Sequence, residues 1–139
     1  MIKDVARQLQ QDENVWCGEG INPRHLADCK QFLKDEERGE LPAEYVALLY
    51  YVNGAFSDSS YLFGIMPESW PGLEDIVVQN EQYNSDYKSS LLFIGSNGFD
   101  WLVYDYATKE YQVRERHEMG IVEYFTDLEQ ALGYWFGLD

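Results

Sequence analysis

Apolar residues in the first half of the chain recur with helical spacing. Over residues 2–11 they fall on one face, which predicts a short amphipathic helix. Asn22-Pro23 predicts the start of a second helix, because Asn can cap it and Pro suits its first turn, and Gly39 predicts its end. Leu41-Pro42 predicts a third helix by the same device, and Asn53-Gly54 predicts where it stops.

The segments between these helices are expected as loops and one short strand. Glycines predict a loop over residues 15–20, and polar residues predict another over 55–60. Residues 61–65 are a short apolar run that predicts a strand. Apolar positions in residues 73–80 then fit one more helix of roughly ten residues.

The hydrophobic period changes after residue 90. Residues 91–95 form a continuous apolar run, which is typical of a strand buried on both faces. Ser96-Asn97-Gly98 predicts a turn after it. Residues 101–106 and 111–116 alternate between apolar and polar positions, and residues 121–125 fit one more short strand. Together these segments predict an antiparallel meander.

A capping box predicts the start of a closing helix. Thr126 and Glu129 have the spacing in which each can bond the backbone N–H of the other, and an apolar stripe follows from Leu128 to Phe136. Helices therefore come first, then strands, then a last helix, without repeated strand–helix alternation. This order predicts the α+β class and a single domain over residues 1–139.

The charge narrows the class of partner. Of the 139 residues, 25 are acidic and ten are Lys or Arg, so the net charge is -15. Residues 39–139 hold 17 of the acids and four of the bases, a net of -13. Phosphate groups attract Lys and Arg, so this charge argues against nucleic acid and against anionic membranes. A basic protein is the natural complement, although an acidic surface can also serve solubility alone.

Neither a membrane span nor a signal peptide is predicted from these residues. No apolar run approaches the ~20 residues of a span. Residues 1–14 lack the apolar centre of a signal peptide. We therefore expect a cytoplasmic protein in which Cys17 and Cys29 are free thiols.

No catalytic residue, cofactor site or metal site is predicted. His25 and Cys29 have a ligand-like spacing of four on a predicted helix, but Cys29 lies on the apolar stripe and no further ligand is indicated. Cys17 and His117 are the one pair that could form a nucleophile and its base, and nothing in the pattern brings them together.

Four motifs in order resemble proteins of the SMI1/KNR4 type, the SUKH superfamily. The first runs from Leu41-Pro42 through Tyr45 to Asn53-Gly54. The others are 62–76, then 92–105 with its Ile-Gly…Gly turn, and 125–132. The resemblance covers roughly residues 22–136. Ala55, Thr126 and Trp101 depart from the usual pattern.

The resemblance implies an α+β fold with a mixed, mostly antiparallel sheet, packed by N-terminal helices and a closing C-terminal helix. Its bacterial members are similar to immunity proteins, which bind and neutralise a polymorphic toxin, often a nuclease. The matching residues set backbone geometry or fill the core, so no catalytic residue carries over.

The segment from residue 58 to 86 is the predicted partner-binding surface. It is rich in acids and offers one Trp in a Pro/Gly loop, an arrangement that suits an apolar anchor within a charged rim. The candidate residues are Asp58, Glu68, Trp70, Glu74, Asp75, Glu81 and Asp86. The alternative is that Trp70 only fixes its loop to the core.

Our interpretation of the sequence is a non-catalytic immunity protein that binds a basic toxin through its acidic surface. Two alternatives stay open: an intracellular scaffold or regulatory interaction module, and a small hydrolase with an undetected site. The sequence leaves the oligomeric state open.

Overall fold

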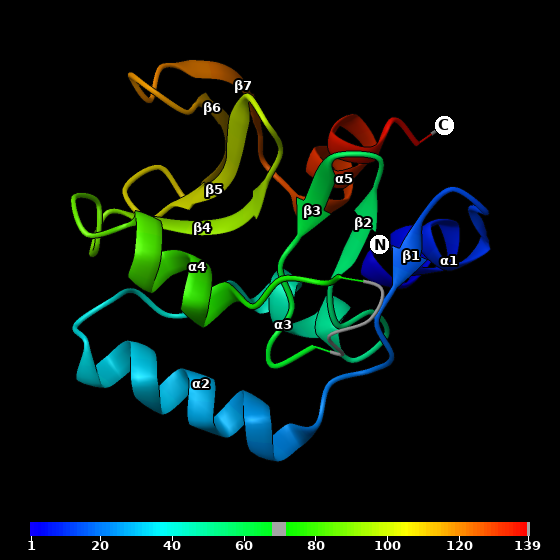
Figure 1. The fold of residues 1–139 in the computed structure, drawn as a ribbon, viewed down its shortest axis with the longest axis horizontal. Coiled ribbons are helices and arrows are strands. Elements are labelled where there is room, and N and C mark those ends of the chain that lie inside the picture. The colour runs from blue at the N-terminus through cyan, green and yellow to red at the C-terminus, as the bar shows by residue number, and fades with distance from the viewer. Residues whose placement is uncertain (68–71, 139) are drawn as a thin grey trace.

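The computed structural model describes residues 1–67 and 72–138 (Figure 1). In this part of the chain five helices accompany seven strands. The helices are α1 (Ile2–Gln11), α2 (Pro23–Asp35), α3 (Ala43–Leu49), α4 (Ile76–Tyr83) and α5 (Leu128–Phe136). The strands are β1 (Trp16–Cys17), β2 (Ala55–Ser57), β3 (Ser60–Leu62), β4 (Leu91–Ser96), β5 (Asp100–Asp105), β6 (Glu110–Glu115) and β7 (Ile121–Phe125). The predicted α+β class is confirmed.

The seven strands form one sheet in chain order, from β1 at one edge to β7 at the other. Every neighbouring pair is antiparallel. The meander predicted for β4, β5 and β6 is present, and all residues of β4 up to Gly95 are buried. A parallel bridge outside these strands joins Gly64 to Asp75.

Helices pack against different parts of the sheet: α1 contacts β1, α4 contacts β4, and α5 contacts β6 and β7 (Figure 1). The apolar face of α1, with Val5, Ala6 and Leu9 buried, lies against α3 and α5. α4 lies on β4, whose Phe93 backbone bonds with the buried side chain of Asn80. None of the helices in the described residues has the length and apolar character needed to span a bilayer.

Two predicted loops are wrong, because both contain short strands. Residues 15–20 include β1, and residues 55–60 include β2 and the start of β3. The physical reason is a pairing between distant segments: the N–H of Gly18 donates to the carbonyl of Gly54 at 2.8 Å, and the N–H of Asn53 donates to that of Gly18 at 3.2 Å. Strands of two or three residues show no hydrophobic period from which to predict them.

Several helix ends differ from the prediction. α5 is capped by Asp127, whose Oδ1 accepts the N–H of Gln130 at 2.8 Å, and not by Thr126. α2 ends at Asp35, short of Gly39. Gly39 serves another purpose: a Cβ there would lie 2.2 Å from the ring of Tyr106, so only glycine admits this ring. α3 likewise ends at Leu49, and α4 begins at Ile76 rather than at residue 73.

Candidate functional site

The motif around Tyr45 and Asn53 builds the interior of the fold. The buried Tyr45 hydroxyl donates to the carbonyl of Phe63 at 2.5 Å. The Asn53 side chain donates to the carbonyl of Ile65 at 3.0 Å and accepts its N–H at 2.7 Å. Gly64 lies so close that a Cβ there would be 2.7 Å from the Asn53 carbonyl oxygen. These residues hold the backbone and leave no group free for chemistry.

The predicted partner-binding residues do not form one patch. Glu68 and Trp70 lie outside the described residues. The remaining acids divide into two places. Four of them lie on α4 or in the segments that flank it: Glu74, Asp75, Glu81 and Asp86. Asp58 lies apart, in the turn of the β2–β3 hairpin (Figure 1).

Asp75 has a structural role that its neighbours lack. Its Oδ1 accepts the N–H of Val77 at 2.9 Å and so caps α4. Burial raises the pKa of this carboxyl, although bonds from backbone N–H groups oppose the shift. Glu74 accepts a bond from Gln79 at 3.1 Å. Glu81 and Asp86 are exposed and form no ion pair with other described residues, so they alone of this group are available to a partner.

Few carboxylates are neutralised. Among the described residues, only two basic side chains form ion pairs. Lys88 lies 3.9 Å from Glu36, and Arg114 lies 3.3 Å from Asp105. The remaining pairs are made by the N-terminal ammonium group. Most carboxylates of the described residues therefore have no cationic group within 4.0 Å.

Other arginines contact neutral groups instead. Arg38 donates to the carbonyls of Asn84 at 3.0 Å and Asn80 at 3.4 Å, which leaves its charge at the C-terminal end of α4. Arg116 lies over the ring of Trp101, 4.1 Å from its centroid. Neither guanidinium offsets a carboxylate.

An acidic, aromatic cluster stands where the β4–β5 turn meets the β6–β7 turn. We call Phe99, Asp100, Glu115 and Glu118 the acidic tip. Phe99 is 81% exposed. Asp100 and Glu115 are direct partners across β5 and β6, an arrangement in which like charges repel. The sequence pattern did not predict this site, since its residues meet only through strand register; an apolar Phe beside a turn was the one local signal.

The two carboxyls of the acidic tip differ in their surroundings. Burial, and then the charge of Glu115, raise the pKa of Asp100. Glu115 accepts the N–H groups of His117 and Glu118, both at 2.8 Å, and these bonds lower its pKa. Glu115 therefore holds the turn, while the Asp100 carboxylate has no hydrogen-bond donor among the described residues.

The cysteines are unsuited to nucleophilic chemistry. Both are free thiols, as predicted, and Cys29 is buried in the core. Burial raises the pKa of Cys17 to about 11 and that of Cys29 to about 12, so both thiols stay protonated near neutral pH. In residues 1–67 and 72–138, no group of three or more His, Cys, Asp or Glu is arranged to hold a metal ion.

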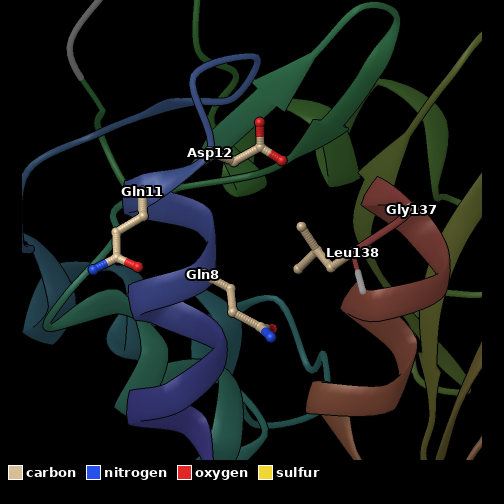
Figure 2. A pocket seen from close by; sticks show the side chains of 5 residues that line it. All are labelled: Gln8, Gln11, Asp12, Gly137 and Leu138. Carbon is tan, nitrogen blue, oxygen red and sulfur yellow. The ribbon is translucent and has the colours of Figure 1, made fainter.

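Two hollows mark the surface. Figure 2 shows one of about 280 Å³ between α1 and the end of α5, lined by Gln8, Gln11, Asp12, Gly137 and Leu138, a set without a nucleophile or a cation. A larger groove of about 900 Å³ separates α2 from α3. Lys30 and Lys34 of α2 line this groove, together with Arg38. Arg116, by contrast, lies beside the acidic tip, where its N–H donates to the carbonyl of Phe99 at 3.0 Å.

A scan against models of known protein families finds no match for this chain. A search of curated proteins also finds no match. Membership of the SMI1/KNR4 type therefore stays a prediction.

Proposed function

We propose that this chain is a cytoplasmic, non-catalytic immunity protein of the SMI1/KNR4 type, which neutralises a basic toxin by binding it. A nuclease is the class of toxin that this charge suits best, because a nuclease holds a phosphate backbone in a cationic cleft. An acidic protein can occupy such a cleft in place of nucleic acid.

The observation that carries the proposal is the acidic surface that stays unneutralised. Here the bases of the second part of the chain are scarce, and Arg116 contacts rings rather than carboxylates. In the acidic tip, Asp100 and Glu115 lie directly opposite each other, and the repulsion between their carboxylates lowers stability. A cationic partner would relieve that repulsion.

The chemistry of the thiols supports binding rather than catalysis. A Cys nucleophile needs a lowered pKa, and the pKa of both Cys17 and Cys29 is raised. The polar side chains of Tyr45 and Asn53 are hydrogen-bonded to backbone groups inside the fold. The exposed features that remain are charge and a few aromatic rings, which are the means of protein recognition.

Suppression of toxicity tests the proposal. The chain is produced in cells together with the product of the neighbouring gene, tested as the toxin, and growth is followed. A charge-swap variant of the acidic tip, Asp100→Lys with Glu118→Lys, is compared with Glu13→Lys and Glu19→Lys. The control pair changes the net charge equally but flanks β1, at the other edge of the sheet.

We expect growth to be restored by the natural chain and by the control pair, and not by the variant of the acidic tip. If the natural chain fails to protect and does not bind the toxin, the proposed function is wrong. If both variants protect equally well, the acidic tip is not the docking site.

A further inference from the structure

β7 leaves one edge of the sheet open. It is the last strand in the sheet order and pairs with β6 along its other edge. Its side chains are exposed from Ile121 to Tyr124, and the apolar ones among them are 53–61% exposed. An edge strand presents backbone N–H and C=O groups that can pair with another chain.

The backbone of Tyr124 faces that open edge. Gln112 is its partner on β6. The N–H of Arg116 donates to the carbonyl of Phe99 at 3.0 Å and that of Glu115 to the carbonyl of Gly120 at 2.9 Å, so alternate residues of β6 bond toward β5 and toward β7, and Gln112 is one of those that bond toward β5. Gln112 and Tyr124 are therefore a non-hydrogen-bonded pair, and the Tyr124 N–H donates to Glu123 Oε1 at 3.3 Å. Hydrogen-bonded and non-hydrogen-bonded pairs alternate along an antiparallel ladder, so the N–H of such a residue points away from the neighbouring strand. Val122 is the extra residue of a bulge, because the pairing moves directly from Glu123 to Ile121.

We propose that β7 is a docking edge, at which an extended, cationic strand of a partner protein adds to the sheet. The proposal rests on the proposed function, since it names where and how a basic partner binds. An incoming carbonyl takes the Tyr124 N–H from the long bond to Glu123. The released carboxylate is then free to pair with a Lys or Arg of that strand.

Charge selects this occupant over a second copy of the chain. Residues 117–138 contain no Lys or Arg, and three of their acids, Glu118, Glu123 and Asp127, lie on β7 or beside its ends. Pairing of β7 with β7 from another copy would bring like charges together between two molecules of net charge -15. A lysine-bearing strand meets the same carboxylates with the opposite sign. The exposed Ile121, Val122 and Tyr124 give it apolar surface to cover.

Amide chemical shifts of the full chain, recorded with two synthetic peptides, test the proposal. One peptide alternates Lys with Val and Thr; the other has Glu in place of each Lys. We expect the lysine peptide to shift the amides of residues 121–125 most and to slow hydrogen exchange at Tyr124. We expect the glutamate peptide to leave them unchanged.

Two variants separate edge pairing from general attraction. Tyr124→Pro removes an N–H that makes no ladder bond, so the sheet is retained, and binding of the lysine peptide should weaken about tenfold. Glu123→Lys keeps every backbone group and should reverse the preference, so that the glutamate peptide binds better. The matched control is Glu81→Lys on α4, which should change neither preference.

In the peptide experiment, any of these results would overturn the proposal: shifts centred on α4, no shift of the β7 amides with the lysine peptide, or equal binding of both peptides. A dimer that Tyr124→Pro dissociates would show that a second copy covers the edge, and it would equally reject a cationic strand. If the Glu123→Lys chain still suppresses the toxin fully, only the docking edge is wrong and the proposed function stands.

Discussion

The repulsion within the acidic tip gives a prediction in which two neighbouring substitutions act in opposite directions. Asp100→Asn removes one of two carboxylates that face each other across β5 and β6, and it removes no hydrogen bond made by that carboxylate in the described residues. It should therefore stabilise the protein. Glu115→Gln removes the same repulsion but weakens two bonds from backbone N–H groups, so it should destabilise the β6–β7 turn.

The size of the Asp100 effect follows from its position. Cross-strand charge pairs change stability by roughly 0.2–1 kcal/mol, and partial exposure places this one at about 0.3 kcal/mol. Because the pKa of Asp100 is raised on folding, its ionised form is the penalised one. The gain from Asp100→Asn should be complete at pH 7 and disappear as the pH falls below the pKa of the unfolded Asp, about 3.9. Salt should reduce it as well.

Urea unfolding at low ionic strength measures this prediction. With a slope of about 1–3 kcal/mol per molar urea, the midpoint for Asp100→Asn should rise by roughly 0.1–0.3 M at pH 7 and should not change at pH 3. The same variant should bind a basic partner more weakly, so stability and binding move apart. A lower midpoint at pH 7, or equal effects of the two substitutions, would refute the reasoning.

Three further predictions concern a buried side chain, a thiol in β1 and a helix cap. Asn53→Ala should cost about 2–4 kcal/mol in urea unfolding, since it leaves both backbone groups of buried Ile65 without partners; a cost below about 1 kcal/mol would contradict this. Cys17 should react with a disulfide reagent at pH 8 about 100-fold more slowly than in the urea-unfolded chain, because its raised pKa leaves less thiolate. The stability that accompanies this raised pKa should be lost as the pH rises from 9.0 toward about 11. Asp75→Ala should cost about 1 kcal/mol as a lost cap, whereas Glu81→Ala should stay within about 0.5 kcal/mol; similar values would show that Asp75 does not cap α4.

A clear hydrophobic periodicity was sufficient to predict the longer helices and strands. α1 begins and ends where the sequence places it, and β4, β5 and β6 occupy the predicted meander with boundaries that differ by one residue. Each of these helices and strands buries a whole face, so the order of apolar and polar residues along the chain predicts which face is buried. Cys29 was predicted for the core on the same ground.

The short elements depend on contacts that the local pattern does not contain. β1 and the β2–β3 hairpin exist because Asn53 and Gly54 bring the chain back against Gly18. The cap of α5 was assigned to Thr126 because a capping box fits there, but Asp127 stands one residue closer to the helix and accepts its N–H. Here two good caps compete, and backbone geometry decides between them.

The candidate site, too, could be predicted only as far as its residues do not depend on contacts between distant segments. Composition alone predicted an acidic surface, since ten Lys and Arg cannot neutralise 25 Asp and Glu. Which carboxylates serve structure could not be read from the sequence: Asp75 caps a helix, and Glu115 holds a turn. Asp100 and Glu115 are neighbours only because of strand register, which is why the acidic tip was missed.

The association rate of this chain with the toxin proposed as its partner, followed against ionic strength, tests the central claim most directly. If carboxylates guide the encounter, the rate constant should fall by about 100-fold between low and high salt, and the Asp100→Lys, Glu118→Lys variant should lose most of that dependence. A rate that stays the same across the salt range, in both proteins, would contradict the account.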